Sequence, residues 1–261
     1  MRLLVLLTAL AMPIVAWLSN TGAFGPDQGE ISGRYPTLLV AAGYAFSIWG
    51  LIFLLDLAYA GWQMTRERKG DVTVKRIAPW AAAGFFLTTI WMPLFSQEMF
   101  WLCLAVIFGA LVCLAYCAVQ LSRDPAPTDG QWAWAWLPLS LHAGWLTLAA
   151  FLNLAQVIVA YELLPVDRQL PWSLGLYAVA AVVLLALNHR MRGNLVYAAA
   201  ALWALVAVYL RQSSHGLAGA DTSAWVAVFV AIVLAAQTAM LRVRNPGGWL
   251  PAEGRRPMLR R

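Results

Sequence analysis

Charged side chains are scarce in this sequence. Asp, Glu, Lys and Arg make up 11% of the 261 residues, whereas 62% are hydrophobic. Soluble proteins carry nearer a quarter charged residues, and apolar runs of about 20 residues are typical of membrane-spanning helices. The composition therefore excludes a soluble globular domain and makes the lipid bilayer the main partner. The net charge of +6 does not indicate nucleic-acid binding, because the basic residues lie in short segments between apolar runs.

Cysteine is also rare, and the common cofactor motifs are missing. Cys103, Cys113 and Cys117 all lie in one apolar segment, so a disulfide framework is not expected. Cys113 and Cys117 share a helical face, but two thiols without a nearby histidine or third sulfur make a poor metal site. The sequence contains no P-loop and no convincing dinucleotide fingerprint. We therefore expect no metal, no required cofactor and no catalytic residue.

Eight apolar segments predict an all-α, polytopic membrane bundle of about eight transmembrane helices. The expected spans are Leu3–Leu18, Leu38–Trp62, Pro79–Leu94, Phe100–Leu121, Leu137–Ala160, Trp172–Leu187, Leu195–Leu210 and Thr222–Leu241. They divide the chain into a five-helix bundle (1–160), an outer loop (161–171), a three-helix extension (172–241) and a basic cytoplasmic tail (242–261). An alternative for the first span is a cleaved signal peptide within residues 1–23. The Gly- and Pro-rich segment Ser19–Thr37 is expected to be an outer loop that acts as a lid.

The distribution of basic residues predicts the orientation. With both termini inside, fifteen of the eighteen Lys and Arg residues lie on the inner side, and only Arg34, Arg168 and Arg211 lie outside. Cytoplasmic loops of membrane proteins carry such an excess of positive charge. We therefore expect a multi-pass protein of a bacterial inner membrane with both termini in the cytoplasm.

Two spans carry an aromatic and polar stripe at helical spacing. The stripes consist of Trp49, Phe53, Asp56, Ala60 and Gln63 in the second span, and of His142, Trp145, Ala149, Asn153 and Gln156 in the fifth. Such stripes suit the wall of a ligand cavity. The alternative is a seam between helices, in which the polar side chains form interhelical hydrogen bonds. Trp203 is a further deep tryptophan that either packs between helices or contacts a ligand.

Asp56 and His142 are expected to meet inside the bundle. At a rise of about 1.5 Å per residue, Asp56 lies about 9 Å and His142 about 10 Å to the inner side of their span midpoints. An ionisable residue within a span is costly and usually faces a partner. We predict a buried Asp56–His142 pair, which either relays a proton or simply joins two helices. Tyr44, Trp91 and Asn153 fall in the outer half, where a cavity open toward Ser19–Thr37 would be largely aromatic.

Three motifs resemble the TspO/MBR family of tryptophan-rich sensory proteins, in its longer bacterial form. The segment from Gly29 to Phe53 is similar to the family's loop-to-second-helix region, with Pro36, Tyr44, Phe46 and Trp49 at the matching positions. IWMPLF places Trp91, and PLSLHAGWLTLAAFLN places Ala149 and Asn153. The resemblance covers roughly residues 1–160. It implies a five-helix bundle whose pocket binds tetrapyrroles such as haem or protoporphyrin, and sterol-like molecules in some relatives.

The sequence departs from that family at three places. His142 stands where the family usually has tyrosine, and Asp56 replaces an apolar residue. The helices expected within 172–241 have no counterpart in short family members.

The leading hypothesis is an integral membrane binding protein, a sensor or carrier, for a tetrapyrrole or another hydrophobic ligand. The expected ligand residues are Tyr44, Phe46, Trp49, Trp91, Trp145, Ala149 and Asn153, with Asp56 and His142 beneath them. The alternatives are a proton-coupled transporter and a porphyrin-degrading membrane enzyme. A homodimer is a further alternative to a single chain.

Overall fold

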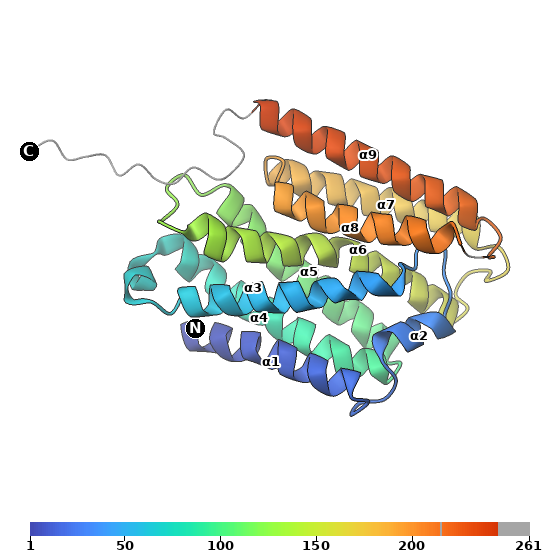
Figure 1. Cartoon of the computed structure of the whole chain (residues 1–261), viewed down its shortest axis with the longest axis horizontal. Helices are drawn as coiled ribbons and strands as arrows, with labels where there is room; N and C mark the ends of the chain where they lie inside the picture. Colours follow the sequence, from blue (N-terminus) through green and yellow to red (C-terminus); the bar gives the residue numbers. More distant parts are fainter. Residues whose placement is uncertain (215, 245–261) are drawn as a thin grey trace, which may run out of the picture.

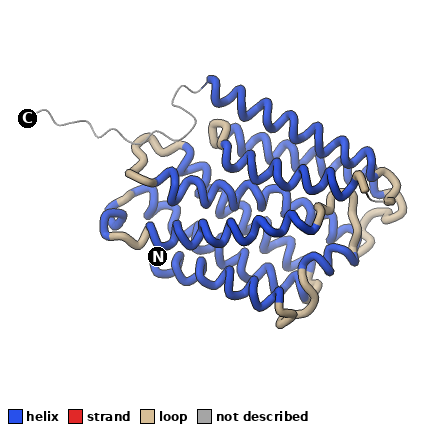
Figure 2. The backbone as a smooth tube through the Cα atoms, in the orientation of Figure 1, coloured by secondary structure: helices blue, strands red, loops and turns tan. Residues whose placement is uncertain are grey.

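The structure is a computed structural model that describes residues 1–214 and 216–244. It consists of helices joined by loops and contains no strand within those ranges (Figure 2). The long helices are α1 (Arg2–Asn20), α3 (Ile48–Trp62), α4 (Val72–Ser96), α5 (Phe100–Ser122), α6 (Leu137–Ala160), α7 (Gln169–Arg190), α8 (Leu195–Gln212) and α9 (Ala220–Arg244). Shorter turns are α2 (Gln28–Arg34), the 3-10 helices η1 (Gly43–Ser47) and η2 (Arg66–Gly70), and the π-helical turn η3 (Trp132–Trp136). Eight helices in this part of the chain are long and apolar enough to cross a membrane. The predicted polytopic bundle is confirmed.

The long helices run back and forth along one axis, so that α1 begins and α9 ends at the same end of the bundle (Figure 1). This end, which we call the basic end, carries most of the basic residues. The opposite end holds only Arg34, Arg168 and Arg211 among the described Lys and Arg residues. Of the tail predicted at 242–261, residues 245–261 lie outside the described residues, and the first three residues continue α9.

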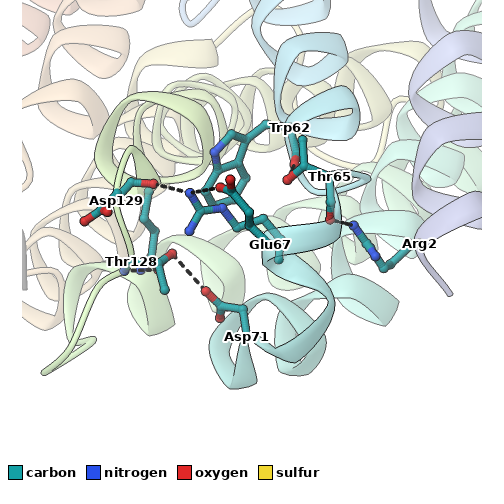
Figure 3. A network of polar contacts seen from close by, with 9 residues as sticks. Arg2, Trp62, Thr65, Glu67, Asp71, Thr128 and Asp129 are labelled. Atoms are coloured by element: carbon teal, nitrogen blue, oxygen red, sulfur yellow. Dashed lines mark hydrogen bonds and ion pairs between the residues drawn. The ribbon is translucent and has the colours of Figure 1, made fainter.

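Loops at the basic end are joined by polar contacts. The α5–α6 loop bonds to the start of α4 through Thr128, whose hydroxyl donates to the Asp71 carboxylate at 2.9 Å (Figure 3). Asp71 also caps α4 by accepting the backbone N–H of Val74. Arg2 at the start of α1 donates to the Thr65 carbonyl oxygen in the α3–α4 loop. These bonds fix the ends of α1, α3, α4 and α6 relative to one another.

Helix α6 is the centre of the bundle. It packs against α3 and α5 on one side and against α7 and α8 on the other (Figure 1). At Gly144 the backbones of α6 and α8 are so close that a Cβ atom would collide with the carbonyl oxygen of Tyr197. Next to this contact, the hydroxyls of Thr147 and Tyr197 are hydrogen bonded at 2.9 Å. The three-helix extension is therefore packed tightly onto the rest of the bundle.

Three predicted segments differ from the structure. The span expected at Pro79–Leu94 begins seven residues earlier, because α4 starts at Val72. Ser19–Thr37 is not a plain loop, because it contains α2, which Asp27 caps by accepting the N–H of Glu30. The second span was expected from Leu38, but helical structure begins only at Gly43. Pro36 disfavours helical backbone at Tyr35, where α2 has ended, and the following residues 37–42 obtain hydrogen bonds from other parts of the chain.

The extension supplies those bonds. The side chain of Gln212 on α8 donates to the carbonyl oxygens of Thr37 (3.1 Å) and Val40 (3.0 Å). The N–H of Ala42 donates to the carbonyl oxygen of Ala207 at 2.9 Å. From α7, the side chain of Gln169 accepts the N–H of Leu38. The 37–42 segment thus lies along α7 and α8 instead of extending α3.

Candidate ligand site between α3, α4 and α6

An aromatic cavity lies in the half of the bundle away from the basic end. Its walls come from α2, the 37–42 segment, η1, α3, α4 and α6. The lining residues are Ser32, Val40, Ala41, Phe46, Trp49, Trp91, Phe95, Trp145, Ala149, Leu152, Asn153 and Gln156. The space is about 30 Å³, which is room for about two water molecules. Any larger ligand therefore requires the aromatic side chains to move apart.

Six of the seven ligand residues proposed from the sequence lie in this wall: Phe46, Trp49, Trp91, Trp145, Ala149 and Asn153. The four aromatic side chains among them pack against one another. Trp49 is 5.8 Å from Trp145 and 6.3 Å from Trp91 between ring centroids, and Phe46 is 6.3 Å from Trp145. Trp91 stacks on Phe95 at 4.8 Å. The arrangement presents several ring faces and edges to one small space.

Tyr44 lies apart from the other six. Its side chain is 41% exposed and packs edge-on against Trp203, with the ring centroids 5.2 Å apart. Trp203 in turn donates its indole N–H to the carbonyl oxygen of Ala45 at 3.2 Å. The cause is local, because Tyr44 lies in the 3-10 helix η1, where the tighter winding changes the direction of a side chain relative to an α-helix.

Polar groups in the cavity wall are only partly satisfied. The indole N–H of Trp91 donates to Asn153 Oδ1 at 2.9 Å, and Asn153 Nδ2 donates to the carbonyl oxygen of Ala149. In contrast, the indole N–H groups of Trp49 and Trp145 are buried and have no hydrogen-bond partner among the described residues. An unsatisfied buried donor costs about 1–3 kcal/mol. Two such donors beside a cavity favour a ligand that carries hydrogen-bond acceptors.

The cavity is closed at its outer end, although the sequence predicted an opening toward Ser19–Thr37. Gln156 donates to the hydroxyl of Ser32 on α2 at 3.2 Å. At the C-terminal end of α2, Arg34 and Tyr35 both donate to Glu98 in the α4–α5 turn, at 2.9 and 2.6 Å. The bond to this carboxylate raises the pKa of Tyr35 above its ordinary value. In this structure α2 therefore covers the outer end of the cavity, in the position of the predicted lid.

The predicted partner of Asp56 is in contact with it. His142 Nδ1 lies 2.7 Å from Asp56 Oδ2, and neither side chain is exposed. On its other side, His142 Nε2 lies 3.3 Å from the hydroxyl of Thr88, which donates its own proton to the carbonyl oxygen of Gly84. Because the Thr88 proton is directed to Gly84, the hydrogen-bond network assigns the proton on Nε2 as the donor to Thr88, and a hydrogen bond joins Nδ1 and Oδ2.

Trp49 separates this pair from the cavity. Its ring lies perpendicular to the His142 ring, with the centroids 5.7 Å apart, while Phe85 stacks on His142 at 6.1 Å. Asp56 Oδ1 and the hydroxyl of Tyr59 are buried without a partner among the described residues. Asp56 and His142 thus lie behind the cavity wall, as the depth comparison predicts.

Sequence reasoning missed part of the wall. Phe95 follows Trp91 by four residues on the same helix, so the helical period alone could have identified it. Leu152, one residue before Asn153 on α6, was also not predicted. Ser32 lies on the short helix α2, Val40 and Ala41 lie in the 37–42 segment, and no sequence signal marks these three residues.

Comparison with known proteins identifies one relationship. A family model described as "TSPO-like protein" matches residues 2–240. The match is wider than the 1–160 segment on which the sequence resemblance rests, because it includes α7, α8 and most of α9. No curated protein and no solved structure matches the chain.

Proposed function

The chain belongs to the family of TSPO-like proteins, and from this premise we propose that it is a membrane binding protein for a tetrapyrrole or another flat hydrophobic ligand. It would act as a sensor or carrier. Family membership supports a membrane-bound binding or sensory protein. The observation that carries the finer proposal is the aromatic cavity, whose wall contains two buried indole N–H groups without acceptors.

The lining residues indicate the chemistry of the ligand. Aromatic faces and edges suit a planar apolar body, and the N–H groups of Trp49 and Trp145 suit acceptor atoms on it. The wall contains no His, Cys or Met side chain, and His142 behind it is already bonded on both ring nitrogens. A haem iron would therefore find no ligand in the wall. A metal-free macrocycle such as protoporphyrin fits these residues better.

Titration with protoporphyrin IX tests the proposal. In purified protein reconstituted in lipid nanodiscs, the porphyrin should quench tryptophan fluorescence. The variants Trp91→Ala and Asn153→Ala should weaken binding about tenfold or more, because each removes one partner of a buried hydrogen bond in the wall. The matched control is Trp225→Ala, since Trp225 is a tryptophan on α9 that is 66% exposed. Absence of quenching, or equal affinities in all variants, would overturn the proposal.

The placement in the membrane is part of the same proposal. The excess of Lys and Arg at the basic end supports a cytoplasmic position for this end, and with it both termini, in a bacterial inner membrane. A cysteine introduced at Lys69 should resist an impermeant thiol reagent in intact cells, and one introduced at Asp167 should react with it. The three native cysteines are buried, so they give little background. The reverse labelling pattern would show the opposite topology, with the basic end outside the cytoplasm.

A second function, proton-coupled transport, is favoured by the Asp56–His142 pair. The two side chains are hydrogen bonded to each other within the membrane-spanning part of the bundle, and intramembrane carboxylates and histidines are used as proton relays. In proteoliposomes, porphyrin movement driven by a pH gradient would support this function. Asp56→Asn should then abolish the dependence on the gradient while leaving equilibrium binding in place. Porphyrin movement at the same rate with and without the pH gradient would exclude proton-coupled transport.

A further inference from the structure

A groove lies between α1 and α3, on the membrane-facing side of the cavity wall. Its volume is about 560 Å³. Trp17 on α1 and Leu54 on α3 border it and are each 65% exposed, so the groove faces the lipid. Pro13 lies inside α1 and Gly50 lies on α3, both in the groove lining. A Cβ atom on Gly50 would meet nothing within 4 Å, so the missing side chain leaves the groove open.

The cavity and the groove share two wall residues, Phe46 and Trp49. These two side chains form the partition between them. The indole N–H of Trp49 makes no hydrogen bond within the described part of the chain, and Phe46 has no polar group in its side chain. Rotation of both side chains therefore breaks no hydrogen bond, and it would connect the small cavity with a much larger space.

The other approach to the cavity is held far more firmly. Displacing α2 requires breaking the Gln156–Ser32 bond and both bonds to Glu98. Displacing the 37–42 segment requires breaking the bonds of Gln212 to two backbone carbonyls. The bonds of Gln156 and Gln212 are buried, and each buried bond left unmade costs about 1–3 kcal/mol. The side-chain partition, which holds no such bond among the described residues, is therefore the easier barrier to cross.

The groove also has a polarity that matches an amphiphile in a bilayer. Along the membrane it is lined by apolar side chains such as Leu54, Leu57 and Met92. At its outer end it carries Asn20, Gln28 and Ser47, which are polar and uncharged. A flat apolar molecule with one polar edge would fit along the groove. Its apolar body would contact the apolar side chains, and its polar edge would contact the polar residues at the outer end.

We infer that this groove is the portal of the binding site, and that the ligand passes from the lipid between α1 and α3 into the cavity past Phe46 and Trp49. The inference rests on the proposed function and adds the route and the physical state of the ligand, which is a membrane-dissolved amphiphile. The lid formed by α2 stays shut during this exchange.

The kinetics of porphyrin binding test the portal. In Gly50→Leu an apolar side chain fills part of the groove without touching the cavity. With protoporphyrin IX predissolved in the nanodisc lipid, stopped-flow quenching should show association and dissociation rates that both fall about tenfold, with an unchanged Kd. The matched control is Gly175→Leu, because Gly175 on α7 is also exposed and also has nothing within 4 Å of an added Cβ. Its rates should equal those of the wild type.

A third variant separates the two routes. Glu98→Gln weakens the bonds that hold Arg34 and Tyr35, and it should leave both rates unchanged if the ligand enters sideways. Unchanged rates in Gly50→Leu, or faster association in Glu98→Gln, would overturn the portal. A lower affinity at an unchanged association rate would also overturn it, since the groove would then be part of the binding site. If the wild type binds no porphyrin at all, the proposed function itself fails.

Discussion

His142 Nδ1 lies 2.7 Å from Asp56 Oδ2 at the contact between α3 and α6, and both side chains are fully buried. Removal of one partner from a buried pair leaves a polar group without its bond, which costs about 3–5 kcal/mol where the pair is charged. The bond therefore holds the two helices in register directly behind the cavity. Thr88 on α4 extends the network to a third helix.

A double-mutant cycle should show that Asp56 and His142 are energetically coupled. Asp56→Ala and His142→Ala should each lower the free energy of unfolding strongly. The double variant should lose less than the sum, with a coupling energy of about 1–3 kcal/mol. The free energy of unfolding is measured on the protein in mild detergent, with tryptophan fluorescence as the signal for unfolding. Asp56→Asn, whose amide NH2 can donate to Nδ1 while Nε2 keeps its proton, should lie close to the wild type. Additive losses would mean that the contact contributes nothing specific.

The second prediction concerns Gln212, which ties the three-helix extension to the cavity. Its amide donates to the carbonyl oxygens of Thr37 and Val40. Gln212→Leu therefore leaves the Val40 carbonyl unpaired and removes one of two donors to the Thr37 carbonyl, which still accepts the N–H of Val40. The 37–42 segment should then open more often. Hydrogen exchange at the Ala42 amide should become faster, on the order of tenfold for a loss of about 1.4 kcal/mol.

Gln237→Leu is the matched control for this change. Gln237 on α9 also donates to a backbone carbonyl oxygen, that of Leu185 at 3.1 Å, but it lies away from the segment. Exchange at Ala42 should not respond to it. Equal acceleration in both variants would indicate a general loss of packing rather than the loss of a specific clamp.

The contacts of Arg34 and Tyr35 with Glu98, at the outer end of the cavity, predict that stability depends on pH. Tyr35 donates to Glu98 at 2.6 Å, and this bond raises the pKa of Tyr35 above 10.0. A group whose pKa is higher in the folded state stabilises the fold below its unfolded pKa, and this contribution is lost as pH rises through the folded pKa. The stability difference between wild type and Tyr35→Phe should therefore be constant from about pH 7 to 9 and should shrink above about pH 10. Unfolding midpoints measured over this range check it, and parallel curves up to pH 11 would contradict it.

Periodicity predicted the parts of this protein in which regular helices determine the position of a side chain. The stripes on α3 and α6 correctly bring Trp49, Asp56, His142 and Asn153 toward one another, because each residue keeps its angular position along a regular helix. The depth comparison works for the same reason, since the rise per residue is constant.

The predictions from the sequence were wrong or incomplete where tertiary contacts, rather than regular helical hydrogen bonds, determine the backbone. Val40 and Ala41 line the cavity because α7 and α8 bind the backbone of their segment, and those contacts connect residues more than 130 positions apart. Tyr44 points away because η1 is a 3-10 turn rather than the start of an α-helix. The closed state of the lid depends on Glu98, a turn residue that no pattern connects with α2.

The last prediction separates ligand binding from stability at Trp145. Its side chain is 3% exposed, and its indole N–H has no partner among the described residues. Trp145→Phe keeps an aromatic ring in the wall and removes the unsatisfied donor, although the smaller ring gives up some packing. The ligand-free protein should therefore lose less stability than a buried tryptophan normally would, whereas affinity for protoporphyrin IX should fall about 5- to 10-fold, corresponding to the roughly 1–1.4 kcal/mol of one hydrogen bond. Asn153→Ala should lower both quantities, because it breaks a bond that exists without ligand. If Trp145→Phe left the affinity unchanged, the unpaired N–H would play no part in recognition, and the acceptor atoms assigned to the ligand would have to be given up.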